Sequence, residues 1–136
     1  AADWLDLLHR QRVDFTLGWR RLADAAAGDE APLRTLFGGR EAPSAWLARW
    51  LARCAADGRD GPARADAMRG VNPFVIPRNH RVEEALAAAS DEGDLAPFER
   101  LLEALRRPFE ETPELAPYGE PAPPAVTACY QTFCGT

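Results

Sequence analysis

The sequence predicts an all-α fold, an irregular bundle of about five to six short helices with an extended, proline-rich carboxy-terminal tail. Apolar residues recur every three to four positions, which is the period of one helix face. Aspartate, glycine and proline stand where helices commonly begin and end. No segment shows the strict alternation, or the enrichment in valine, isoleucine and threonine, that is typical of a β-strand. The 136 residues, 46% of them apolar, suffice to bury a core.

Residues 1–39 predict three helical stretches. Asp3 can cap the first, and Asp14 can either restart that helix or continue it through Ala26, because a short side-chain oxygen accepts hydrogen bonds from the free N–H groups of a first turn. Gly28 favours a stop after the second helix. Pro32 suits the first turn of a short third helix that ends at the pair Gly38-Gly39.

The segment from Ser44 to about Ala56 predicts a fourth helix with one apolar stripe. The residues of the stripe are Trp46, Leu47, Trp50, Leu51 and Cys54. Its position on the stripe predicts that Cys54 is a packed hydrophobe. Residues 58–62 predict a turn, and Pro62 can open a short helix that continues through Met68.

Residues 71–79 predict an extended connection, because each proline disfavours a helical residue before it. Asn79 or His80 can then cap a helix that continues through Ala89. Asp94 is expected to cap the last strong helix, which Pro108 ends.

The composition predicts two parts, a helical region over residues 1–107 and an acidic, proline-rich tail over residues 108–136. The tail holds six of the twelve prolines, four glutamates and no basic residue. Such a segment buries too little apolar surface to offset its ordering entropy unless something docks it. The plausible docking points, which are expected to meet the helical body, are Leu115, Tyr118, Val126, Tyr130 and Phe133.

Charge and residue usage exclude several function classes. The net charge of −5 and the lack of a dominant arginine cluster argue against nucleic-acid binding. No apolar run is long enough to cross a membrane. All 16 basic residues are arginine, so the chain has no phosphate-binding or Schiff-base lysine. The sequence predicts no catalytic residue, no metal ligand set and no nucleotide-binding loop in this segment.

Asn72, Arg78 and Asn79 form the strongest internal pattern. One interpretation is a rigid extended strut that ends in a helix cap. The other is an interdomain contact, in which Arg78 binds a carboxylate or phosphate of another part of the protein.

Cys134 lies two residues from the end of the chain, and Cys129 precedes it. A thiol on a loose tail is accessible, which is the first requirement of thiol–disulfide chemistry. Three widely spaced cysteines do not form a disulfide framework, so we expect a reducing compartment and a cytoplasmic location. Cys134, and possibly Cys129 as well, is predicted to be a redox or regulatory residue; an inert tail thiol is the alternative.

Several motifs, in order along almost the whole chain, resemble the selenoprotein O family, also known as the YdiU family. They are Asp14-Phe-Thr-Leu-Gly-Trp-Arg-Arg-Leu22, Pro32–Phe37, Trp46–Trp50, Val71–Asn79, Gly93-Asp94, Leu105–Phe109 and the Phe133-Cys134 ending. The resemblance covers only the carboxy-terminal part of such proteins. The start at Ala1 and the single methionine, Met68, fit the same expectation of a longer bacterial polypeptide.

The resemblance implies that the parent protein is a kinase-like adenylyltransferase. It would bind ATP with Mg²⁺ or Mn²⁺ and transfer AMP to serine, threonine or tyrosine hydroxyls of protein substrates. The catalytic residues would lie upstream, and the upstream kinase-like domain would be the partner of this segment. Cys134 matches a family position associated with a regulatory disulfide to the activation segment.

Two alternatives remain open from the residues alone. The chain could be a free-standing helical interaction module whose apolar stripes receive a partner helix. It could also be a small thiol oxidoreductase that uses Cys129 and Cys134, in which case a thiol with a depressed pKa is expected.

Overall fold

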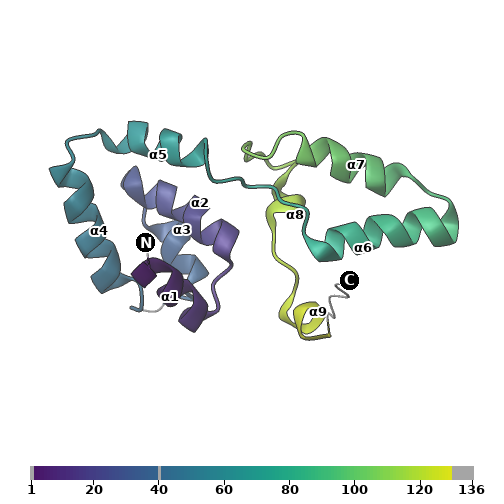
Figure 1. Ribbon diagram of the computed structural model, residues 1–136, viewed down its shortest axis with the longest axis horizontal. Helices are drawn as coiled ribbons and strands as arrows, with labels where there is room; N and C mark the ends of the chain where they lie inside the picture. The colour runs from purple at the N-terminus through teal and green to yellow at the C-terminus, as the bar shows by residue number, and fades with distance from the viewer. Residues whose placement is uncertain (1, 40, 130–136) are drawn as a thin grey trace. The chain divides into compact units, whose positions relative to one another are not determined.

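The computed structural model describes residues 2–39 and 41–129, and over these residues it contains nine α-helices, one five-residue π-helix and no strand (Figure 1). The predicted all-α fold class is therefore confirmed. The chain folds as two compact units, Ala1–Phe74 and Val75–Thr136, which we call the first and the second unit. None of the helices in the described ranges has the length and apolar character needed to cross a membrane.

The first unit contains five helices: α1 (Ala2–Gln11), α2 (Phe15–Ala26), α3 (Ala31–Leu36), α4 (Ser44–Ala56) and α5 (Gly61–Arg69). Asp14 caps α2 as predicted, and its Oδ1 accepts a hydrogen bond of 2.8 Å from the Leu17 amide. Asp3 lies inside the first turn of α1 and not before it, where its charge still favours the positive helix end. The predicted stop at Gly28 is confirmed by a left-handed backbone with φ of +100°.

A cluster of aromatic rings forms the centre of the first unit. Trp4 is fully buried, and its ring stacks on Trp46 with a centroid separation of 4.4 Å. Trp19 and Phe37 contact other sides of the same ring, and Trp50 extends the stack from Trp46. Trp46 and Trp50 are only half-buried, so the stripe of α4 lies at the edge of the core.

Helix α2 is the element on which α3 and α5 pack. Gly61, the first residue of α5, lies so near α2 that a Cβ atom there would be 2.6 Å from the Ala26 carbonyl oxygen. The absence of a side chain thus permits the close approach of the two helices.

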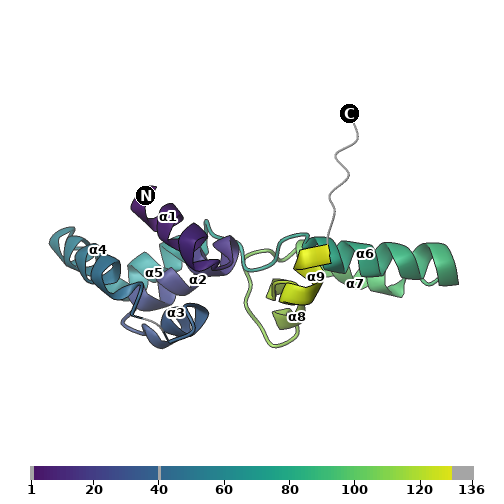
Figure 2. The same cartoon turned by 90° about the horizontal axis from the view of Figure 1, so that it is seen from below.

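The second unit contains α6 (Asn79–Ala87), the π-helix η1 (Ala88–Glu92), α7 (Ala96–Leu105), α8 (Ala116–Gly119) and α9 (Pro124–Cys129). Helices α6 and α7 lie side by side (Figures 1 and 2). The predicted cap at Asp94 is displaced by one residue: Leu95 is the N-cap of α7, and Asp94 before it accepts a 2.9 Å hydrogen bond from the Ala96 amide. The predicted cap at Asn79 or His80 is wrong: Arg78 is extended, and its carbonyl accepts from the Arg81 and Val82 amides, so the helix begins one residue earlier.

The residues after 108 belong to the second unit and do not form a separate compact body. The Val75 amide donates to the Pro108 carbonyl oxygen at 3.0 Å, and Leu115 is 3% exposed. Arg81 Nε of α6 donates to the Pro117 carbonyl oxygen at 3.1 Å. The compact units divide at residues 74 and 75, inside the predicted extended connection. The predicted division into residues 1–107 and 108–136, which follows the change of composition, stays a prediction.

Candidate functional site

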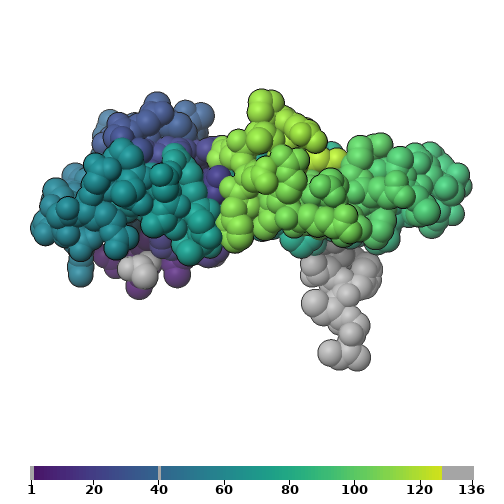
Figure 3. All heavy atoms as spheres, turned by 90° about the horizontal axis from the view of Figure 1, so that it is seen from above, coloured from purple at the N-terminus to yellow at the C-terminus, as the bar shows by residue number. Residues whose placement is uncertain are grey.

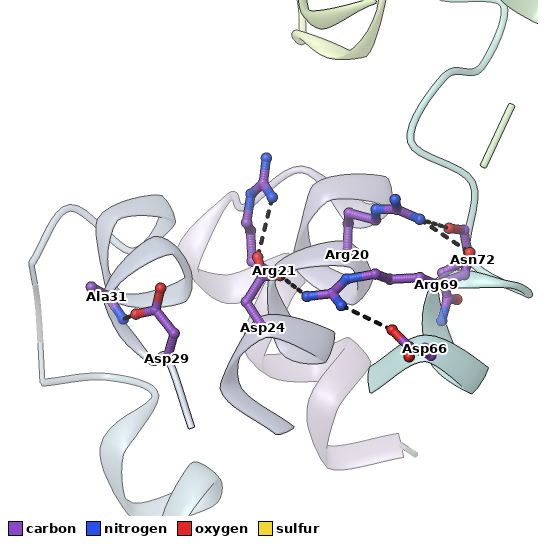
Figure 4. A network of polar contacts seen from close by, with 8 residues as sticks. All are labelled: Arg20, Arg21, Asp24, Asp29, Ala31, Asp66, Arg69 and Asn72. Carbon is purple, nitrogen blue, oxygen red and sulfur yellow. Dashed lines mark hydrogen bonds and ion pairs between the residues drawn. The ribbon is translucent and has the colours of Figure 1, made fainter. Parts of the chain in front are cut away.

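The side chain of Arg20 binds the end of α5 and the beginning of the connection. Arg20 lies on the buried side of α2 and is 3% exposed. Its Nη1 donates to the carbonyl oxygens of Arg69 at 3.0 Å and Asn72 at 3.1 Å (Figure 4). Carbonyls at a helix carboxyl end lack intrahelical donors and carry partial negative charge, so a guanidinium is a suitable partner for them.

The ring of Phe74 lies against two guanidinium groups. Arg20 Cζ and Arg21 Cζ are each 5.9 Å from the ring centroid, within the range of a cation–π interaction. Phe74 is 4% exposed, so the attraction acts where little water screens it. The interaction fixes the last residue of the first unit.

Two aspartates complete the cluster. Asp24 accepts hydrogen bonds from Arg21 at 3.1 Å and from Arg69 at 2.7 Å, and Arg69 also pairs with Asp66 at 3.4 Å (Figure 4). The hydrogen bond to Asp24, above all, raises the pKa of Arg69. We call Arg20, Arg21, Asp24, Asp66 and Arg69 the arginine cluster.

The structure separates the three residues that the sequence grouped as a candidate contact. Asn72 follows α5 and caps its last turn, because its backbone N–H and its Nδ2 both donate to the Met68 carbonyl oxygen at 2.9 Å. Arg78 and Asn79 lie in the second unit, where Arg78 is 9% exposed and Asn79 is exposed. Asn72 therefore has a structural role beside the arginine cluster. The interdomain role of Arg78 and Asn79 stays a prediction.

Sequence reasoning missed Arg20, Asp24 and Arg69. A signal for Arg20 was present, because it stands three residues from both Leu17 and Ala23, on the packing face of α2. An arginine at such a position requires internal partners. Its acceptors, about 50 residues later in the chain, had no comparable signal because backbone carbonyls carry no residue identity.

The second unit contains an open cavity of about 500 Å³ between α6 and the chain before and within α9. His80, Arg81 and Glu84 line one side, and Glu120 and Val126 line the other. Burial, assisted by the positive charges of Arg81 and Arg78, lowers the pKa of His80. Arg81 forms an ion pair with Glu84 at 2.8 Å, so these two opposite charges at the cavity wall compensate each other.

No group of three histidine, cysteine, aspartate or glutamate residues within 2–39 and 41–129 is placed to hold a metal ion. Cys54 is a free, half-buried thiol in α4, in partial agreement with its predicted packing. Cys129 is the last residue of α9. Cys134 lies outside the described residues, so the redox prediction stays a prediction.

The chain is similar over its whole length to several curated bacterial proteins. It is 52% identical over 136 residues to the protein nucleotidyltransferase YdiU of Cereibacter sphaeroides and 49% identical to that of Chromobacterium violaceum. It is 46% identical over 138 residues to the protein of the same name from Rhodopseudomonas palustris. The match covers 100% of this chain but only 27–28% of each relative, at the carboxy-terminal end. No family model and no solved structure matches the chain.

Proposed function

Because this chain belongs to the YdiU family as a carboxy-terminal segment, we propose that it is the helical supporting region of a protein nucleotidyltransferase and not its catalytic part. The observation that carries the proposal is the extent of the match: the whole chain corresponds to about a quarter of relatives named for nucleotidyl transfer. The remainder of such a protein is the natural place for the nucleotide and metal sites.

The interior of the first unit supports a structural role. Its largest buried side chain, Trp4, is enclosed by other aromatic rings. Its buried cation, Arg20, binds backbone carbonyls and a phenyl ring. Because Arg20 binds the end of α5, Asn72 and Phe74, it holds the start of the connection in place, as a rigid support requires.

We further infer that the parent transfers AMP from ATP, with Mg²⁺ or Mn²⁺, to serine, threonine or tyrosine hydroxyls of proteins. In that reaction the hydroxyl would lose its proton to a base upstream of this segment, and its oxygen would form a bond to the α-phosphorus of ATP. The bond between the α-phosphorus and the bridging oxygen would break and pyrophosphate would leave, and a bound metal ion would supply compensating positive charge there. Each step would take place upstream of this segment.

The proposed regulatory element is the thiol of Cys134, with Cys129 as a nearby second thiol. Oxidation of Cys134 and an upstream thiol by a small disulfide, such as glutathione disulfide, would form one protein disulfide and release two reduced thiols. Because the partner thiol lies upstream of Ala1, the closed loop has more than about 130 residues, and its closure stabilises the closed state by on the order of 5 kcal/mol in the chain-entropy model. A switch of this size could hold the tail against the upstream part until a reductant released it.

The test compares three purified proteins: the 136-residue chain, the full parent and a parent from which this segment is deleted. Each is incubated with labelled ATP, Mg²⁺ or Mn²⁺ and a protein acceptor. We expect AMP transfer by the parent, no transfer by the 136-residue chain, and a deleted parent with a lower melting temperature and little activity. AMP transfer by the 136-residue chain alone would overturn the proposal.

A further inference from the structure

Helices α6 and α7 expose large apolar side chains that a folded unit normally covers. On α7, Phe98 is 45% exposed and Leu102 is 39% exposed, and Leu95 at its start is 57% exposed. On α6, Leu86 is 56% exposed. Contiguous apolar patches of this kind mark interaction surfaces more often than isolated exposed leucines do.

The three residues of α7 lie on one side of the helix. Their spacing of three and four positions places them one above another along the axis. The buried residues of the same helix, Leu101 and Ala104, point toward another side. The apolar stripe of α7 is therefore wider than the part of its surface that packs against α6, and the rest of the stripe is exposed.

Leu86 continues the stripe across to α6. Successive helical residues are turned by about 100° around the axis. Leu86 directly follows buried Ala85, and Leu102 directly follows buried Leu101. In two right-handed helices that face each other and run in opposite directions, as α6 and α7 do in Figure 1, residues that follow inward-facing ones emerge on the same side of the pair. We call Leu86, Leu95, Phe98 and Leu102 the hairpin face.

The hairpin face stays uncovered by the described part of the chain, and atoms of α7 form part of the surface that Figure 3 shows. The length of the relatives indicates what covers it. The 136 residues are 27% of the Cereibacter protein, so about 370 of its residues lie outside this segment. A support must contact what it supports, and apolar surface is the strongest source of such contact.

We propose that the hairpin face is the surface on which the upstream nucleotidyltransferase part of the same polypeptide docks. The inference rests on the proposed function and adds the location of the interface. The upstream part would present a complementary apolar surface that covers these side chains.

The experiment measures how fast single cysteines react with a maleimide in the full parent and in the 136-residue chain. Phe98→Cys and Leu86→Cys report on the hairpin face. Glu103→Cys, on the same helix but at a side chain that is 61% exposed and polar, is the matched control. Site-resolved mass spectrometry separates the new thiols from Cys54, Cys129 and Cys134. If one variant fails to fold by circular dichroism, the other still decides the question.

We expect the two face cysteines to react at least tenfold more slowly in the parent than in the 136-residue chain, with the control changing less than twofold. Equal rates in both proteins would overturn the proposal. Protection that grows with the concentration of the 136-residue chain would identify a second copy as the occupant instead. Restored labelling after deletion of residues 130–136 from the parent would identify the tail. Because labelling needs no catalysis, a parent without AMP-transfer activity would refute the proposed function and leave this interface still decidable.

Discussion

At the scale of single residues, the most informative side chain is Arg20. A guanidinium offers several donors in a fixed plane and is more weakly hydrated than an ammonium group. It can therefore bind the carbonyls of Arg69 and Asn72 with one nitrogen while its plane approaches Phe74. A buried arginine with backbone acceptors and an aromatic neighbour is a structural residue, although its charge first suggests a binding site.

We predict that Arg20→Met lowers the free energy of unfolding by about 1 to 3 kcal/mol, because two part-buried carbonyl oxygens lose their donor. Methionine keeps an apolar stem of similar length, so the change removes the hydrogen bonds and the cation–π contact with Phe74 but little of the apolar packing. Urea unfolding followed by tryptophan fluorescence measures the difference.

The control is Arg10→Met, in which an exposed ion pair with Asp6 is removed. Both partners are more than half exposed, so a loss below about 1 kcal/mol is expected. Equal effects of the two substitutions would show that the contacts of Arg20 contribute no more than a surface ion pair.

At the scale of helices, the packing of α5 on α2 depends on Gly61. We predict that Gly61→Ala destabilises the first unit by about 1 to 3 kcal/mol, because the new Cβ would be 2.6 Å from a backbone oxygen that cannot move independently. Thermal unfolding followed by circular dichroism at 222 nm, a helix band, measures the shift in melting temperature.

The matched control is Gly70→Ala at the other end of α5. Its Cβ would meet its nearest atoms at 3.5 and 3.6 Å, an ordinary contact, and its φ of −69° suits any residue. We expect a change within about 1 kcal/mol, in the stabilising direction if the unfolded chain loses freedom. A Gly61→Ala protein as stable as the control would contradict the proposed close packing.

The helices also show which parts of the secondary structure could be predicted from the sequence. The predicted helix from Ser44 to Ala56 has those bounds in the structure, because a single apolar stripe and the glycine of the next turn define it locally. Helices α8 and α9 were not predicted, because their prolines suggested interruption. Proline in the first turn of a helix removes a donor that has no partner there, so it is compatible with such short helices.

At the scale of the whole molecule, the sequence predicted the fold class but not the division into units. Composition changes at residue 108, but the hydrogen bond from Val75 to Pro108 joins residues on either side of the predicted boundary. Local patterns define helices, whereas units are defined by contacts between distant segments. For the same reason the arginine cluster had no sequence signature beyond the position of Arg20.

The tail provides a prediction about the complete polypeptide. We expect the AMP-transfer rate of the full parent to change when dithiothreitol replaces glutathione disulfide, because only the oxidised form has its tail cross-linked. Cys134→Ser should abolish that response, and Cys129→Ser should retain it. Peptide mapping without reduction would identify the linked partner. A Cys134→Ser parent that still responds would exclude the proposed switch thiol.

The acceptors of Arg20 lie 49 and 52 residues further along the chain. During synthesis, Arg20 of α2 leaves the ribosome 49 and 52 residues ahead of Arg69 and Asn72, so its guanidinium must remain hydrated until they emerge. Burial of that side of α2 therefore waits for the end of α5, and the first unit closes late and as a whole. A gene fragment cut before the codon of Arg69 would encode helices without the acceptors that allow their charged side to enter the interior.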